Sequence, residues 1–211
     1  MTESYKIRTK RKNLFLRITK GHFATSHSHI NYYIDVTTQK TRLSEARAVA
    51  EELLTYYQDN TIVDTILCLD GTQVIGTCLA DALTSGNFSN MNAHQTIYIV
   101  TPEYTTGSQI IFRDNIAPMI KGKHVLILEA SVSTGYTAQA AVEAVKYYGG
   151  SIAGISAIFA TIENCAGYQV NAAFNPNDLP DYWSYPAHEC PICKEGKKLD
   201  ALVNGYGYSK L

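Results

Sequence analysis

Short apolar runs alternate with amphipathic segments through the middle of the chain. The runs have the length of strands and are mostly aliphatic, as in strands buried on both faces of a sheet. They cover residues 61–69, 96–101, 124–129 and 152–160. Other segments repeat apolar side chains every three or four residues, which predicts helices over residues 43–57, 74–83 and 137–148. Ser44 is the predicted cap of the first helix, and Gly149 and Gly150 are predicted to end the third.

This alternation predicts an α/β fold with a doubly wound, mostly parallel sheet flanked by helices. Parallel neighbours need crossover connections, and helices are the usual crossover. Ligands of such sheets bind beyond the carboxyl ends of the strands, here the loops at residues 70–73, 102–115 and 129–137.

The segments on either side of this core differ from it in composition. We expect one domain, with a core of residues 43–165, a basic N-terminal segment (residues 1–42) and a tail rich in proline and aromatic residues (residues 166–211). The two end segments are expected to form a small hood, with the tail folding over the sheet because its prolines suit a sheet poorly.

Length and composition agree with one domain. The chain has 211 residues, of which 45% are hydrophobic, and a formal net charge of -1. No apolar run approaches the ~20 residues that a membrane span needs, and the N-terminus does not resemble a signal peptide. Five cysteines are an odd number, which argues against a secreted disulfide framework, so we expect a cytoplasmic protein.

Positive charge is concentrated at the N-terminus. Within the first 20 residues, Glu3 is the only acid among the basic residues Lys6, Arg8, Lys10, Arg11, Lys12, Arg17 and Lys20. Such an excess could attract phosphates, nucleic acid or an anionic substrate. Charge runs are more often solvated surface, so we interpret this one as a solvated arm and do not expect nucleic acid as a partner.

The run VLILEASVSTGYT (residues 125–137) leads from a strand into a loop of small hydroxylated residues. A Ser/Thr/Gly loop that opens a helix presents backbone N–H groups and hydroxyls in one concavity, which suits a phosphate. Glu129 could accept hydrogen bonds from hydroxyls of the phosphate's carrier, which predicts a sugar phosphate. The alternative is a tight turn between strand and helix, in which Gly, Ser and Thr only allow the turn conformation and cap the helix.

Residues 125–150 resemble the phosphoribosyl pyrophosphate (PRPP) motif of type I phosphoribosyltransferases, in which four apolar residues and two acids precede a 5′-phosphate loop ending in T-G-x-T. SHSHINYYIDV (residues 26–36) and CPIC (residues 190–193) are similar to segments of orotate phosphoribosyltransferases. The resemblance covers most of the chain. It implies magnesium-dependent transfer of phosphoribose from PRPP to a nitrogen base, such as orotate or another pyrimidine-like base, by a homodimer.

The resemblance also implies roles for three loops. Val132 would begin the 5′-phosphate loop, and Glu129 would face the ribose hydroxyls. The phosphate would be held by Ser133, Thr134, Gly135, Tyr136 and Thr137. The pyrophosphate or its Mg²⁺ would lie against Asp70, Gly71, Thr72 and Gln73. Residues 103–115 match the mobile loop that closes over the reaction centre, where Arg113 is the candidate catalytic cation.

Two departures from the family pattern affect catalysis. Ala130 stands where most members have the second acid, and Arg113 is the only basic residue between Pro102 and Ile120. A catalytically weak or inactive protein that binds PRPP or a nucleotide as a regulator is therefore the alternative function.

A C-x-x-C pair lies in the tail beside an imidazole. Cys190, Cys193 and His188 are the candidate ligands of Zn²⁺, because two thiolates separated by two residues suit a tetrahedral zinc site. Further ligands must come from elsewhere, and the available donors are His22, His27 and His29. The alternative is a reduced pair that holds the tail against the core.

Overall fold

The chain forms two compact units in the structure, a computed structural model that describes residues 4–8, 14–85, 91–93, 95–204 and 207–211. One unit combines Met1–Thr38 with Phe174–Leu211, and the other is Gln39–Ala173. The N-terminal and C-terminal segments therefore build one unit together, and the middle of the chain builds the other.

The larger unit contains a six-stranded sheet with the strand order β10-β11-β9-β8-β4-β5. The strands are β4 Thr65–Cys68, β5 Tyr98–Val100, β8 His124–Val132, β9 Ser151–Ala160, β10 Asn164–Cys165 and β11 Tyr168–Phe174. Because β9, β8, β4 and β5 pair in parallel, their carboxyl ends meet at one edge of the sheet. The predicted α/β fold with a mostly parallel sheet is confirmed.

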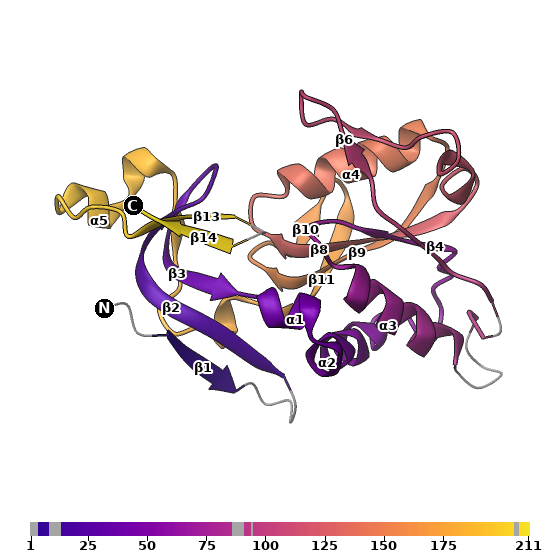
Figure 1. The fold of residues 1–211 in the computed structure, drawn as a ribbon, viewed down its shortest axis with the longest axis horizontal. Coiled ribbons are helices and arrows are strands. Elements are labelled where there is room, and N and C mark those ends of the chain that lie inside the picture. The colour runs from indigo at the N-terminus through magenta and orange to yellow at the C-terminus, as the bar shows by residue number, and fades with distance from the viewer. Residues whose placement is uncertain (1–3, 9–13, 86–90, 94, 205–206) are drawn as a thin grey trace. The chain divides into compact units, whose positions relative to one another are not determined.

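Helices cover both faces of this sheet, with α4 on one face and α2 and α3 on the other (Figure 1). The helices are α1 Thr37–Thr41, α2 Leu43–Leu54, α3 Gln73–Thr84 and α4 Tyr136–Tyr147. Ile127 of β8 shares a buried cluster with Ala141 and Val145 of α4. Helix α3 lies so close to β4 that a Cβ atom on Gly76 would be 2.5 Å from the sulfur of Cys68. This close packing fixes the loop between β4 and α3.

Two features of α2 differ from the sequence prediction. Arg42, with an extended backbone, occupies the N-cap position, so the prediction of Ser44 as the cap was wrong. The helix ends at Leu54 rather than at residue 57. Tyr57 is buried beyond the helix, where its hydroxyl lies 2.7 Å from the hydroxyl of Ser156 in β9. A tertiary contact that the local pattern does not contain therefore sets the position of this tyrosine.

Strand β8 is longer than predicted. It continues past Glu129 to Val132, with Ala130 and Val132 buried and Ser131 exposed. This alternation is that of a strand with one face covered, although the sequence reads as the start of a loop. Helix α4 follows after three residues, and Gly149, at φ 80°, ends it as predicted.

The smaller unit contains a second sheet, ordered β12-β3-β2-β13-β14, in which β1 also pairs with β2. Its strands are β1 Ser4–Arg8, β2 Phe15–Ala24, β3 His29–Asp35, β12 Ser184–Tyr185, β13 Ala201–Asn204 and β14 Gly207–Lys210. The tail (residues 166–211) was expected to fold over the main sheet. Its first segment instead becomes β11 of that sheet, and three later segments become strands of the second sheet. Their backbones pair with the N-terminal strands or with each other, so the tail completes a sheet that the N-terminus begins.

The remaining elements are short. They are the hairpin strands β6 Glu103–Tyr104 and β7 Ile110–Ile111, the helix α5 Pro191–Lys194, and the 3₁₀ helices η1 Ala117–Met119, η2 Pro176–Asp178 and η3 Ala187–Glu189. Of the basic N-terminal residues, Lys6 lies exposed on β1, whereas Lys10, Arg11 and Lys12 lie outside the described residues. None of the helices in the described ranges has the length and apolar character that crossing a membrane requires.

Candidate active site

The carboxyl ends of β4 and β8 are joined directly. The backbone N–H of Leu69 donates to the carbonyl of Leu128 at 2.8 Å. Thr72 is fully buried, and its hydroxyl lies 2.8 Å from the carbonyl oxygen of Leu69 and 3.0 Å from that of Leu128. The hydroxyl of Thr72 is therefore engaged within the protein, where it holds the two strand ends together.

Between these strand ends the chain turns sharply at Asp70 and Gly71. Both residues have a left-handed backbone, with φ 52° at Asp70 and 78° at Gly71. A non-glycine residue in this region stores strain, which is typical of functional loops. Gly71 and Gln73 are exposed, and Gln73 is the first residue of α3, so backbone N–H groups of the helix start border this loop.

Two carboxylates lie close enough at this edge for their charges to interact. Glu129 is 1% exposed, and its Oε1 atom has no hydrogen-bond partner within the described part of the chain. The pKa of Glu129 is raised to about 8, mainly by burial and to a smaller extent by the negative charge of Asp70. Burial also raises the pKa of Asp70, although a hydrogen bond from the backbone of Ala130 and the charge of Lys40 oppose this shift. The neutral form of Glu129 is therefore favoured at pH 7 until a cation or a hydrogen-bond donor arrives.

Lys40 is a member of this site that the sequence did not indicate. Its ammonium group donates to the carbonyl of Asp70 at 2.8 Å, although only 8% of the residue is exposed. The contact stabilises the turn at Asp70 and brings a positive charge to the loop. Lys40 lies in the short helix α1, outside every motif, and its local sequence carries no signal of this role.

The loop after β8 presents polar groups outward. Ser133, Thr134 and Thr137 are exposed, whereas Val132 is buried beneath the loop. The backbone N–H groups of Ser133 and Thr134 donate to no backbone carbonyl among the described residues. The first N–H groups of α4 follow directly, and such groups have no partner inside their own helix. The loop therefore has the donors that a phosphate requires.

Gly135 determines the shape of this loop. Its φ of 80° is left-handed, and it forms the N-cap of α4. A Cβ atom at this position would lie 2.9 Å from the sulfur of Cys165 and 3.0 Å from Ile162 Cδ1. The thiol of Cys165 also donates to the carbonyl of Gly135 at 3.4 Å. Only glycine fits this conformation and this contact, which explains the residue at the centre of the T-G-x-T pattern.

The segment predicted as a mobile loop is a hairpin with an anchored base. Ile110 and Phe112 are buried in the core cluster, and Phe112 packs edge-on against Tyr148. The guanidinium of Arg113 binds both carboxylate oxygens of Glu103, with 2.7 Å from Nε to Oε2. The candidate catalytic cation therefore already has an anionic partner on the same hairpin.

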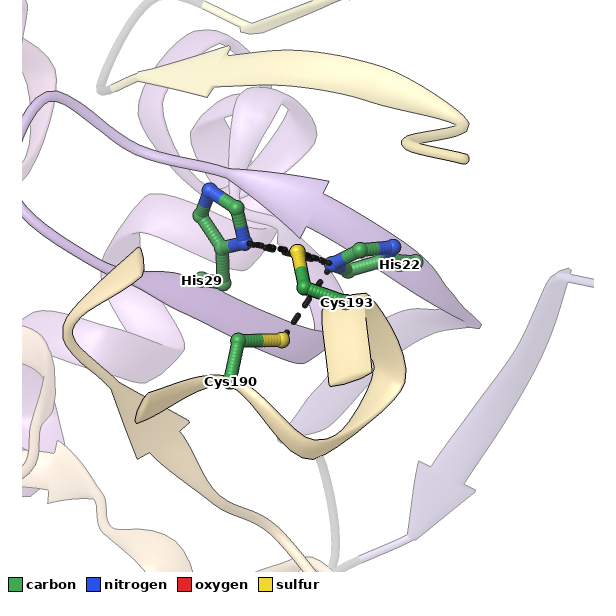
Figure 2. A group of neighbouring side chains, drawn as sticks. All are labelled: His22, His29, Cys190 and Cys193. Carbon is green, nitrogen blue, oxygen red and sulfur yellow. Dashed lines mark hydrogen bonds between the residues drawn. The ribbon is translucent and has the colours of Figure 1, made fainter. Parts of the chain in front are cut away.

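The candidate metal ligands in the tail lie in a different arrangement from the one predicted. His22, His29, Cys190 and Cys193 point toward one another, and their ligand atoms all lie within 4.8 Å of each other (Figure 2). His188 is not in this cluster. Its side chain is 80% exposed, and its Nε2 atom lies 3.3 Å from a carboxylate oxygen of Glu189. The assignment of His188 is therefore corrected, because η3 and α5 turn the cysteines toward β2 and β3 and leave His188 outside.

The chain is similar to known proteins in sequence and in structure. No protein-family model matches the chain. The orotate phosphoribosyltransferase of Chlorobaculum parvum is 28% identical over 185 residues, which cover 86% of this chain and 86% of that protein. The orotate phosphoribosyltransferase of Sulfurimonas denitrificans is 25% identical over 196 residues, covering 86% and 90%.

Among solved structures, the orotate phosphoribosyltransferase of Mycobacterium tuberculosis aligns with a TM-score of 0.53 and 16% identity, covering 77% of this chain and 91% of that chain. At this identity the alignment shows a common fold, and the sequence relatives carry the same enzyme name. These findings confirm the resemblance noted from residues 125–150. The chain thus has the fold of these phosphoribosyltransferase structures and is similar in sequence, over most of its length, to orotate phosphoribosyltransferases.

Proposed function

We propose that the chain is a phosphoribosyltransferase, which transfers phosphoribose from PRPP to the nitrogen of a pyrimidine-like base and releases pyrophosphate. One observation carries the proposal: an outward-facing loop of hydroxyls and backbone N–H groups follows strand β8, whose buried Glu129 has a carboxylate oxygen without a hydrogen-bond partner among the described residues. A 5′-phosphate and the ribose hydroxyls beside it would satisfy both features at once. The relatives' names favour orotate as the first base to test.

The ribose 5-phosphate part of PRPP would be held at the end of β8. The exposed hydroxyls of Ser133, Thr134 and Thr137 and the N–H groups at the start of α4 would donate to the phosphate oxygens. Tyr136 is the first residue of this helix, so its backbone belongs to the same turn. Glu129 would accept hydrogen bonds from the ribose hydroxyls, which would supply the partner that its Oε1 atom does not find among the described residues.

The pyrophosphate would lie against the loop from Asp70 to Gln73, where Thr72 fixes the turn from inside. The residues present fit Mg²⁺, because two interacting carboxylates with raised pKa values would be stabilised by a divalent cation, and carboxylate oxygens are its preferred protein ligands. Asp70 and Glu129 would hold it. When bound, Mg²⁺ would supply positive charge for the departing pyrophosphate. Lys40 would keep the loop in its strained conformation.

Arg113 would contribute only after it leaves Glu103. Its ion pair lies on an exposed hairpin surface, with side chains 65% and 50% exposed, where such pairs are weak. Closure of the hairpin over a pyrophosphate would exchange the carboxylate for a more highly charged partner. With Ala130 in place of a second acid, and with one basic residue on the hairpin, we expect a slow enzyme. Loss of one charge-stabilising donor typically costs about 10² to 10³ in rate.

Steady-state assays with PRPP, Mg²⁺ and a panel of bases test this proposal. We expect pyrophosphate release that depends on orotate or a related pyrimidine, and that disappears when Mg²⁺ is removed. Glu143→Gln, an exposed carboxylate on α4, is the matched control for Glu129→Gln and should keep full activity. Binding of PRPP without turnover of any base would instead support the alternative of a regulator. Sedimentation in the same buffer tests the homodimer that the resemblance implies.

A further inference from the structure

We propose that His22, His29, Cys190 and Cys193 form a tetrahedral zinc site that fastens the tail of the chain to its N-terminal hairpin. The four residues come from two regions far apart in the sequence, the hairpin of β2 and β3 and the segment of η3 and α5 (Figure 2). Two thiolates and two imidazoles are a ligand set that zinc prefers. The site belongs entirely to the smaller unit.

The distances between the ligand atoms match those around a zinc ion. With Zn–S bonds of about 2.3 Å and Zn–N bonds of about 2.0 Å, tetrahedral ligands place N and S about 3.5 Å apart and two N atoms about 3.3 Å apart. The observed separations of His22 Nε2 are 3.3 Å from Cys190 Sγ, 3.6 Å from Cys193 Sγ and 3.2 Å from His29 Nδ1. Cys193 Sγ lies 3.3 Å from His29 Nδ1. All four separations are within about 0.3 Å of the expected values.

A second contact selects the ring form of His22 that binds metal. Its Nδ1 atom lies 3.1 Å from the carbonyl oxygen of Lys198, which can only accept a hydrogen bond. The proton of the neutral ring is therefore on Nδ1, and the Nε2 atom presents its lone pair to the cluster. Metal-binding histidines almost always donate their second nitrogen in this way.

The backbone around His22 is shaped to aim this side chain. The pairing of β2 with β3 shifts register between Lys20 and Phe23, which is the mark of a β-bulge, and a bulge redirects a side chain. The backbone of His22 also binds the tail, because its N–H donates to the carboxylate of Asp200 at 2.8 Å and its carbonyl accepts from the N–H of Asp200 at 2.7 Å. A Cβ atom on Gly21 would lie 2.7 Å from that carboxylate, so glycine permits this approach.

Four protein ligands leave no open coordination position, so the site is structural rather than catalytic. Cys190 is fully buried and His22 is 3% exposed, whereas the four-residue helix α5 that carries Cys193 has no buried residue. A helix of one turn cannot hold itself in place by packing or by its own hydrogen bonds. Zinc would therefore order this segment and seat β13 beside β2.

Metal analysis of the full-length chain tests the proposal. The protein should be produced without an affinity tag in medium without added metal, and its metal content should be measured with that of its buffer. We expect about one zinc ion per chain, in line with the high affinity of structural zinc sites. Cobalt-substituted protein should show the intense visible absorption of a tetrahedral Co²⁺ ion bound to thiolates. Zinc well below one ion per chain, or iron in its place, would overturn the assignment.

Matched variants locate the ion. Cys193→Ala and His29→Ala should lose most of the zinc, while His188→Ala and Cys165→Ser should retain it, because these two side chains lie outside the cluster. Retention of zinc in Cys193→Ala would contradict the ligand set. A metal-free wild-type chain whose mass is 2 Da low, with the disulfide located at Cys190–Cys193 by peptide mapping, would also refute the proposal. The zinc and cobalt measurements on the wild-type chain need no variant, so they test the proposal even if a variant does not fold.

Discussion

Glu129→Gln should make the unliganded protein more stable and should weaken its binding of PRPP. Burial and Asp70 raise the pKa of Glu129 to about 8, whereas the side chain titrates near 4.5 when unperturbed. A raised carboxyl pKa means that the folded state retains a proton that the unfolded state has released. The stabilising contribution is therefore complete below about pH 4.5 and is lost progressively as the pH rises to about 8.

The size of this effect follows from the same pKa. At pH 7, about 2.5 pH units above the unperturbed pKa, the wild-type chain forgoes about 3 kcal/mol of stability, at about 1.4 kcal/mol per unit. Glutamine has nearly the same shape and no charge to lose. The variant should therefore gain up to about 3 kcal/mol relative to wild type at pH 7, and almost nothing at pH 4.5.

Urea unfolding of both proteins between pH 4.5 and 8 measures this difference, with Glu143→Gln as the control for an exposed carboxylate. Calorimetry with PRPP and Mg²⁺ measures the opposite effect on binding, which should also become tighter with pH in the wild type and much less so in Glu129→Gln. A stability difference that does not vary with pH would refute the view that Glu129 is a desolvated carboxylate awaiting a partner.

Three further predictions concern the loops of the site. Gly135→Ala should destabilise the protein more than Gly167→Ala, because both glycines have φ near 80° but only at Gly135 would the added Cβ atom clash. We expect the two free energies of unfolding in urea to differ by about 1 kcal/mol or more, and equal losses would contradict the role of the Cys165 contact. Arg113→Ala should lower kcat by about 10² with folding unchanged, and Glu103→Gln, which frees the guanidinium, should not lower kcat; equal losses would show that the ion pair itself matters. Lys40→Met should weaken PRPP binding and lower the free energy of unfolding by about 1–3 kcal/mol, because the carbonyl of Asp70 loses its charged donor. If urea unfolding and PRPP titration both showed no change, Lys40 would have no role in the site.

The core of the fold was predictable because its signals are local. Apolar runs such as residues 124–129 and the three-to-four spacing in residues 137–148 record burial directly. The end of β8 was missed for a physical reason. Ser131 is polar and faces outward, whereas the residues before and after it in the strand are buried. The same short sequence is equally typical of the start of a loop.

The parts that could not be predicted depend on contacts between distant segments. Beyond Phe174, the tail forms strands because its segments pair with the N-terminal strands, β13 with β2 and β12 with β3. His22 and His29 lie more than 160 residues from the cysteines that they meet, as the separations of 168 and 164 positions show. Spacing within CPIC could indicate a pair of thiols, but it could not choose between nearby His188 and these distant imidazoles.

The proposed function requires that the loop after β8 and the carboxylate of Glu129 bind a ribose 5-phosphate unit. Calorimetric titration of the wild-type chain with PRPP at millimolar Mg²⁺, repeated in the presence of ribose 5-phosphate, is the decisive measurement. We expect saturable binding of one PRPP per chain, weakened by ribose 5-phosphate as a competitor for the same loop. The absence of any binding heat for PRPP, with no protection of the protein against thermal unfolding, would contradict it.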